Sequence, residues 1–237
     1  MKKNTILVGL LVLVGSTLGY CYVAFPSYTW HQKMTLEVEV EGQVYAGSSV
    51  VEMTVSGHPA LLPEIGVRDL ALRGEAVMVE LPRIRYLFAL LTYDAFLTGK
   101  VFHDLVGGVV SAPEKGWARE IRKVRETRVL DPKDYPLLVT FTNINDPKTV
   151  QQVDSDNLAA TFGAGVSLKR ITLEITDEPV TEGKIEGVLG WLLEVDSLTP
   201  REEQPLLAKD QTPEQKISLL DFMDWKTFGE KRKNKKR

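Results

Sequence analysis

The side chains that could bind a metal ion in this chain are three histidines and one acidic segment. His31, His58 and His103 are far apart in the sequence and form no i, i+4 pair, and no Cys–x–x–Cys motif accompanies them. The segment 154–157, DSDN, resembles the first half of a calcium-binding loop, but the glycine and the distant glutamate of such a loop are missing. Capping of a following helix explains these residues better. The sequence therefore predicts no metal site and no cofactor.

Nucleophilic catalysis has equally weak support. Many serine hydrolases place their nucleophile in a Gly–x–Ser–x–Gly turn, which this chain lacks. Ser48 and Ser49 lie within a predicted strand, on opposite faces, where a small hydroxyl usually just packs. Cys21 is the only cysteine, so no internal disulfide forms, and it lies in an apolar segment away from water. No nucleophile and no catalytic residue is predicted.

Glycine pairs could form a phosphate-binding loop, and adjacent carboxylates could form a catalytic pair. Gly163 and Gly165 lie in FGAGVSLK, where a predicted helix precedes a strand, whereas phosphate-binding loops run from strand to helix. Gly163 or Gly165 is interpreted as a helix stop. Gly107–Gly108 lacks the Lys–Ser/Thr continuation. Asp177–Glu178 and Glu202–Glu203 have the character of surface charge as much as of a catalytic pair.

The N-terminal segment decides where the chain resides. After Met1–Lys3 no charged residue occurs before residue 31, and Thr5–Phe25 would form a helix of about 31 Å, which matches a bilayer core of about 30 Å. Pro26 would end that helix. Tyr28 and Trp30 follow, where aromatic rings favour the lipid headgroups. The predicted membrane-anchor residues are Ile6, Leu7, Leu10, Leu11, Leu13, Leu18, Tyr22 and Phe25.

Two alternatives to a retained anchor stay open. A signal peptide would be cleaved before Tyr20, after the small residues Thr17 and Gly19. A lipoprotein would be modified at Cys21, although bulky Tyr20 precedes it. In each case Lys2 and Lys3 keep the N-terminus in the cytoplasm and the following chain is exported. Residues 86–110 carry too many ionisable side chains for a second span, so one crossing is predicted.

Charge is unevenly distributed along the chain. Six of the 29 Lys and Arg residues lie in the last seven positions, which leaves 23 cations against 32 anions in residues 1–230, a formal net charge of −9. A second basic run, residues 117–130, has Ile121 and Val124 at helical spacing and is interpreted as a solvated segment over the acidic body. The candidates for contact with a polyanion such as anionic lipid are Lys231, Arg232, Lys233, Lys235, Lys236 and Arg237. Nucleic acid is not an expected partner, because the body is acidic and no aromatic residues interleave the tail.

Alternating aliphatic and polar residues predict the architecture. Residues 34–41, MTLEVEVE, have the period of a half-buried strand, and 44–57 read as its hairpin partner after a turn at Gly42–Gln43. Gly47 indicates a bulge or a close backbone contact. Further strands are predicted at 76–81, 86–91, 137–142 and 166–176. The fold class is therefore α+β, a mainly antiparallel sheet with two or three short helices, preceded by one transmembrane helix.

Short helices are predicted at two places. A helix within VDSDNLAATFGAG (153–165) would be capped by Asp154 or Ser155, and a helix at 185–192 would bury Trp191. The domain organisation follows: a membrane anchor at 1–27, a periplasmic α+β domain at 28–198, a C-terminal segment packing on that domain at 199–228, and a basic disordered tail at 229–237.

Three longer stretches carry a family resemblance. GQVYAGSSVVE (42–52), GEAVMVELPRIRYLFALL (74–91) and NDPKTVQQVDSDNLAATFGAGVSLKRITLEITDEPVT (145–181) resemble exported or membrane-anchored proteins of proteobacteria that belong to a family without an assigned activity. The resemblance covers most of residues 28–195. It implies an exported bacterial protein with one domain, and it implies no catalytic residues.

The sequence thus favours a single-pass protein of the bacterial inner membrane, with its N-terminus in the cytoplasm and its main domain in the periplasm. The expected role is a non-enzymatic interaction or accessory module of the cell envelope. Its expected partners are the lipid bilayer and another envelope protein. The alternative is an envelope hydrolase whose Asp, Glu or His site is assembled only by folding.

Overall fold

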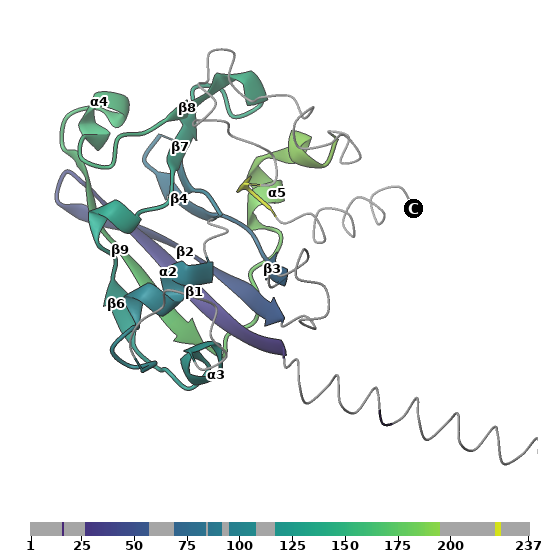
Figure 1. Cartoon of the computed structure of the whole chain (residues 1–237). Helices are drawn as coiled ribbons and strands as arrows, with labels where there is room; N and C mark the ends of the chain where they lie inside the picture. Colours follow the sequence, from purple (N-terminus) through teal and green to yellow (C-terminus); the bar gives the residue numbers. More distant parts are fainter. Residues whose placement is uncertain are drawn as a thin grey trace, which may run out of the picture.

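The computed structural model describes residues 16, 27–56, 69–83, 85–91, 95–107, 117–194 and 221–223. These residues form two antiparallel sheets with a few short helices, which confirms the predicted α+β class (Figure 1). All the predicted membrane-anchor residues and the basic tail, residues 231–237, lie outside the described ranges. Within those ranges, no helix combines the length and the apolar character that a membrane span requires.

The larger sheet has five strands in the order β3-β2-β1-β9-β6. They span Asp69–Arg73, Gln43–Ser56, Ser27–Val40, Val166–Thr176 and Thr127–Val129. The hairpin of β1 and β2 is its centre, with Ser27 opposite Ser56 and Val40 opposite Gln43. The turn is one residue earlier than predicted, at Glu41–Gly42, where both φ angles are positive (51° and 84°). Such a turn suits the right-handed twist of the strands that it joins.

The smaller sheet has four strands in the order β4-β5-β7-β8. They span Val77–Leu81, Arg85–Ala89, Leu138–Phe141 and Val150–Gln152. β4 packs across β2 and β1. A Cβ atom on Gly47 of β2 would lie 1.9 Å from the carbonyl oxygen of Met78 in β4, so this glycine marks the close backbone contact that was one of its two predicted meanings.

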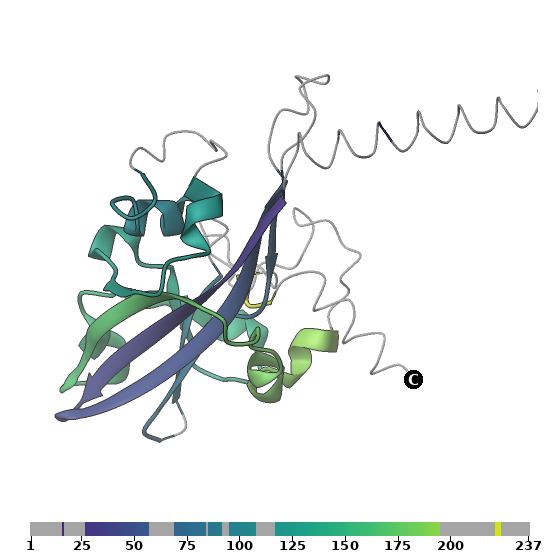
Figure 2. The same cartoon turned by 90° about the horizontal axis from the view of Figure 1, so that it is seen from below.

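Short helices lie on both sides of the long hairpin strands, as Figure 2 shows for α2, α3 and α5. The α-helices span Ala95–Val101 (α2), Trp117–Ile121 (α3), Leu158–Phe162 (α4) and Lys184–Val188 (α5). In the described part of the chain, 3₁₀ helices span Pro132–Asp134 (η2), Pro147–Thr149 (η3) and Gly190–Glu194 (η4). The side chain of Asn157 caps α4 by accepting from Ala160 N, whereas the predicted cap Asp154 accepts from Asp156 N one turn earlier.

Two apolar clusters fill the spaces between these layers. The first joins the inner face of the large sheet to β4, β5, α3 and α4. Trp30 belongs to it: only 4% of the residue is exposed, its ring meets Trp117 edge-on at 5.6 Å, and its Nε1 donates to Gln32. The headgroup position expected for Trp30 is therefore wrong, because β1 begins three residues earlier and turns the ring into the core.

The second cluster covers the other face of the small sheet. Phe88 and Val139 of that sheet pack with Ile185 of α5, with Leu189 just after the helix, and with Phe222. Trp191 lies at the border of this cluster, half-buried rather than fully buried as predicted, and its Nε1 donates to Ile144 O at 2.8 Å.

Glu75, at the start of the small sheet, fixes the N-terminus of α5. Its carboxylate is buried and accepts from the backbone N–H groups of Gly183, Lys184 and Ile185 at 3.0–3.3 Å. A negative charge at this end of a helix is favourable, because the first N–H groups have no partners within the helix. The bond therefore holds α5 to the sheets, and Glu75 has a structural role.

The segment between β9 and α5 crosses the face of the large sheet that points away from the core. The side chain of Lys33 pairs with Glu178 at 2.7 Å on this face. Farther along, Thr181 N donates to Val50 O at the edge of β2, and Val50 N donates to Thr181 Oγ1, both at 2.9 Å. The crossing brings the residues after Thr176 against the beginning of β1.

Candidate functional site

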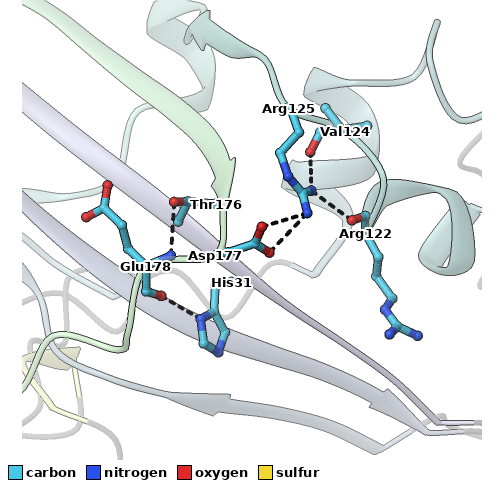
Figure 3. A network of polar contacts seen from close by, with 7 residues as sticks. All are labelled: His31, Arg122, Val124, Arg125, Thr176, Asp177 and Glu178. Atoms are coloured by element: carbon cyan, nitrogen blue, oxygen red, sulfur yellow. Dashed lines mark hydrogen bonds and ion pairs between the residues drawn. The ribbon is translucent and has the colours of Figure 1, made fainter.

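The candidate site is an open groove of about 550 Å³ at the N-terminal end of β1. It is lined by residues 29–31 of β1, by residues 175–177 at the end of β9, and by four cations, Arg119, Arg122, Lys123 and Arg125. The lining holds four cations and one carboxylate, Asp177, a formal charge of +3 without His31. Figure 3 shows the groove's polar contacts. The site is therefore suited to an anionic group.

The local sequence explains how the cations are presented. Ile121 and Val124, at the spacing of one helical turn, are buried in the first cluster and anchor α3 and the turn after it. Arg122, Lys123 and Arg125 alternate with these anchors and are exposed. The predicted helical anchors are thus confirmed, although α3 ends at Ile121.

Arg125 is the fixed member of the group. Its Nη2 donates to both carboxylate oxygens of Asp177 at 3.0 and 2.9 Å, and its Nη1 donates to the carbonyl oxygens of Arg122 and Val124 at 2.9 and 2.7 Å (Figure 3). Both side chains of the ion pair are solvated, so the pair contributes little to stability. Its consequence is orientation: it joins the turn after α3 to the end of β9 and sets the width of the groove.

Arg122 is the cation of the groove whose side chain is not held by another described residue. Its guanidinium makes no hydrogen bond or ion pair with any residue that the structure describes, and Figure 3 shows it extending away from the network while its carbonyl accepts from Arg125. The other two cations are partly committed to Glu120, with Lys123 at 2.7 Å and Arg119 at 3.4 Å. The hydrogen bond from Lys123 lowers the pKa of Glu120, so this carboxyl stays ionised beside the groove.

His31 is held by structural partners. Its Nδ1 lies 2.7 Å from the carbonyl oxygen of Glu178, which can only accept, so Nδ1 donates there. Its Nε2 lies 3.4 Å from a carboxylate oxygen of Glu52 on the neighbouring strand. His31 therefore ties the segment after β9 to β1 and lies beside the carboxylate of Glu52 on β2.

A second hollow, of about 590 Å³, lies beside β7 and β8 and is lined by Tyr135, Leu138, Gln152 and Asp154 among others. Burial raises the pKa of Tyr135, and the charges of Asp131 and Asp156 add to that effect. The carboxylate of Asp154 accepts from Asp156 N. This hollow gathers no group of like charge, and it carries less functional information than the basic groove.

The candidate residues from the sequence are placed as follows. Among the described residues no cluster of three or more His, Cys, Asp or Glu side chains could hold a metal ion. His103 is exposed on the loop after α2, far in sequence from His31, and its Nδ1 donates to Lys100 O at 3.0 Å. Ser49 is buried and donates to Glu75 O at 2.6 Å. His58, Cys21, Gly108 and Glu202–Glu203 lie outside the described ranges.

The basic run at 117–130 was visible in the sequence, where it was interpreted as a solvated segment. The structure gathers four of its cations at one groove, beside the start of β1 and the end of β9. This run of basic residues was therefore the feature of the sequence that indicated the site. The residues that complete the groove could not be predicted, because Asp177 lies 52 residues from Arg125 and is brought to it only by the sheet.

Comparison with known proteins adds no assignment. No family model, no curated protein and no solved structure matched this chain.

Proposed function

We propose that this protein is a single-pass, membrane-anchored domain on the periplasmic side of a bacterial inner membrane, and that it acts as a non-enzymatic binding module. The observation that supports the proposal is the basic groove at the start of β1. Thr29 and His31 line it, a few residues after the apolar segment 5–25 that we expect to be the anchor. The binding surface would thus adjoin the membrane in which the chain is held.

The groove has the properties of a binding site for anions. Arginine guanidinium groups match the planar oxygens of carboxylate and phosphate, and the hydrogen bonds of Arg125 to Asp177 join the two sides of the groove. The basic tail, Lys231 to Arg237, would add a second contact of the same sign. An acidic body with localised positive charge is attracted to an anionic surface in one orientation.

The alternative, an envelope hydrolase, has less support from this geometry. A hydrolase of this kind needs a general base beside a cleft, and the Nε2 atom of His31 lies 3.4 Å from the Glu52 carboxylate while its Nδ1 is bonded to Glu178 O. Asp177, the carboxylate in the groove, is bound by Arg125 on both oxygens. Asp177 is the one carboxylate in the described lining, so the groove holds no pair of carboxylates.

Location is tested with the full chain carrying alkaline phosphatase after Arg237, a reporter that is active only outside the cytoplasm. We expect an active fusion in the membrane fraction. A second fusion that carries a cytoplasmic reporter at the same position should be inactive. Activity of the cytoplasmic reporter alone would overturn the proposed topology.

The non-enzymatic role is tested by a turnover screen of the purified full chain on esterase, phosphatase and glycosidase substrates. We expect no turnover above that of a matched mock purification. Hydrolysis that is lost in His31→Ala or Asp177→Asn, while the circular dichroism spectrum is unchanged, would replace the binding module with the hydrolase alternative.

A further inference from the structure

The basic groove concentrates positive charge on a chain that is otherwise acidic. Four cations and one carboxylate line it, in a chain whose residues 1–230 have a formal net charge of −9. Charge of one sign that is gathered in a concave surface of an oppositely charged body creates a local field that selects an anion. The groove is therefore more than an average stretch of solvated surface.

The uncommitted donors define the chemistry of the ligand. Both Nη atoms of Arg125 are bonded to Asp177 or to backbone carbonyl oxygens, so this side chain acts as a support. Arg122 has no partner among the residues that the structure describes, and Arg119 has only a 3.4 Å contact with Glu120. Two arginine forks at one groove match the several oxygens of a phosphate group better than a single carboxylate.

Position identifies the source of that phosphate. From Ser27 to His31 the strand advances only about 13 Å, at about 3.3 Å per residue. The headgroup layer of a bilayer extends roughly 5–8 Å beyond the hydrocarbon core on each side. With the anchor ending near Pro26, extended arginine side chains at this end of β1 would reach the phosphates of the membrane surface.

We propose that the groove binds the phosphate of anionic phospholipid headgroups in the membrane that holds the anchor, with Arg119 and Arg122 as the contacting residues and Arg125 as a positioning residue. The inference rests on the proposed membrane-anchored function and adds the ligand class. Binding in the groove fixes the domain's orientation on the bilayer. The segment between β9 and α5, which carries Asp177, and the turn after α3, which carries Arg122, then both face the lipid.

The test uses the full chain reconstituted in nanodiscs of phosphatidylcholine alone or with phosphatidylglycerol. A trace of photoactivatable phosphatidylglycerol or phosphatidylcholine, labelled at the headgroup, is crosslinked, and peptides that cover residues 117–129 are quantified by mass spectrometry. We expect these peptides to crosslink to phosphatidylglycerol in preference to phosphatidylcholine. The preference should weaken when salt is raised from about 0.05 to 0.5 M, since screening shortens the range of the attraction.

Two matched double variants distinguish a loss of groove residues from a loss of positive charge anywhere on the surface. Each arginine close to an anionic surface contributes about a fivefold factor, so Arg119→Gln with Arg122→Gln should lower the groove crosslink roughly tenfold or more. Lys148→Gln with Lys169→Gln removes two exposed cations elsewhere and should leave it unchanged. Arg122→Lys, which keeps the charge without the fork, should lie between wild type and the double variant.

Three outcomes would overturn the inference. One is equal crosslinking of residues 117–129 to both lipids, another is an equal loss in the two double variants. The third is full displacement by millimolar inorganic phosphate, which would assign the groove to a soluble phosphate instead of a headgroup. Circular dichroism checks that each variant is folded. The reporter fusions decide topology separately, so failure of lipid binding in a correctly inserted chain rejects this inference alone.

Discussion

At the scale of single residues, Arg128 shows how one side chain of the basic run becomes structural while its neighbours stay available. Its guanidinium binds Asp104 through two bonds of 2.5 and 2.8 Å, reaches Val101 O and Glu126, and lies 5.4 Å from the Phe102 ring centre. It joins β6 to the end of α2. Arg128 is therefore absent from the lining of the groove, although it belongs to the same basic run.

The pair of Arg128 and Asp104 predicts a pH-dependent contribution to stability. Hydrogen bonding to Arg128 lowers the pKa of Asp104 in the folded chain below its usual 3.8. A lowered folded pKa stabilises the folded state above the unfolded pKa, and this contribution is lost as pH falls through the folded value. Asp104→Asn should therefore lower Tm at pH 7, and the difference from wild type should shrink below about pH 4.

Thermal melts of wild type, Asp104→Asn and the control Glu80→Gln between pH 3 and 7 test this. Glu80 is exposed and has no described ion-pair partner, so its variant should follow wild type across the range. A constant difference between Asp104→Asn and wild type over all pH values would contradict the expected linkage.

At the scale of elements, the crossing of β4 over β2 fixes how the two sheets pack. Gly47 is the contact point, and the atoms closest to its missing side chain are backbone atoms of Met78, which cannot rotate away. Alternating aliphatic residues on both strands then fill the space around the crossing, including Val38, Val79 and Leu81. The strand pattern supplies the apolar surfaces, and one glycine lets them meet.

Gly47→Ala should therefore destabilise the domain by about 3 kcal/mol, the upper end of the usual cost of overpacking, because a Cβ at 1.9 Å from a carbonyl oxygen forces the sheets apart. Urea unfolding followed by tryptophan fluorescence measures the free energy of unfolding. Gly187→Ala in α5 is the control, since its Cβ would meet nothing within 4 Å, and helix propensity predicts a gain of about 0.5–1 kcal/mol. Equal effects of the two substitutions would contradict the close contact.

At the scale of the whole molecule, the chain returns to its own core near its C-terminal end. Residues 221–223 reach the small sheet, where Ala76 N donates to Phe222 O and Leu91 N donates to Asp221 O, and Glu75 bridges to Met223. Phe222 is fully buried, with ring contacts to Phe88 and Phe141 at 5.6 and 5.8 Å. This short segment closes the second cluster together with α5.

Phe222→Ala should lower the free energy of unfolding by about 3–5 kcal/mol, the usual cost of removing a buried phenylalanine ring. Phe222→Leu, which keeps most of the apolar contact, should cost clearly less. Urea titrations of the full chain measure both variants. A Phe222→Ala chain as stable as wild type would show that the second cluster does not depend on this segment.

Local patterns in the sequence predicted the central strands of the two sheets but not the short strands β3, β6 and β8. The prediction for β9, Val166–Thr176, is correct to the residue. The hairpin of β1 and β2 was also predicted, although its turn lies one residue earlier and β1 begins at Ser27, seven residues before the predicted start at Met34. The fold class followed from the same signal, because alternation of apolar and polar residues is a property of each strand by itself. Gly42, Gly47 and Gly163 were also recognised as backbone positions of special geometry.

Tertiary structure alone decided what those elements build. Trp30 faces the core because β1 begins at Ser27, and Asn157 caps α4 because the chain makes one more turn after Asp154. The basic groove exists because β9, α3 and the start of β1 meet, which brings Asp177 to Arg125 from 52 residues away. Periodicity is set by neighbours in the chain, whereas a site is set by which distant segments pack together, and that depends on the shape and volume of the whole core.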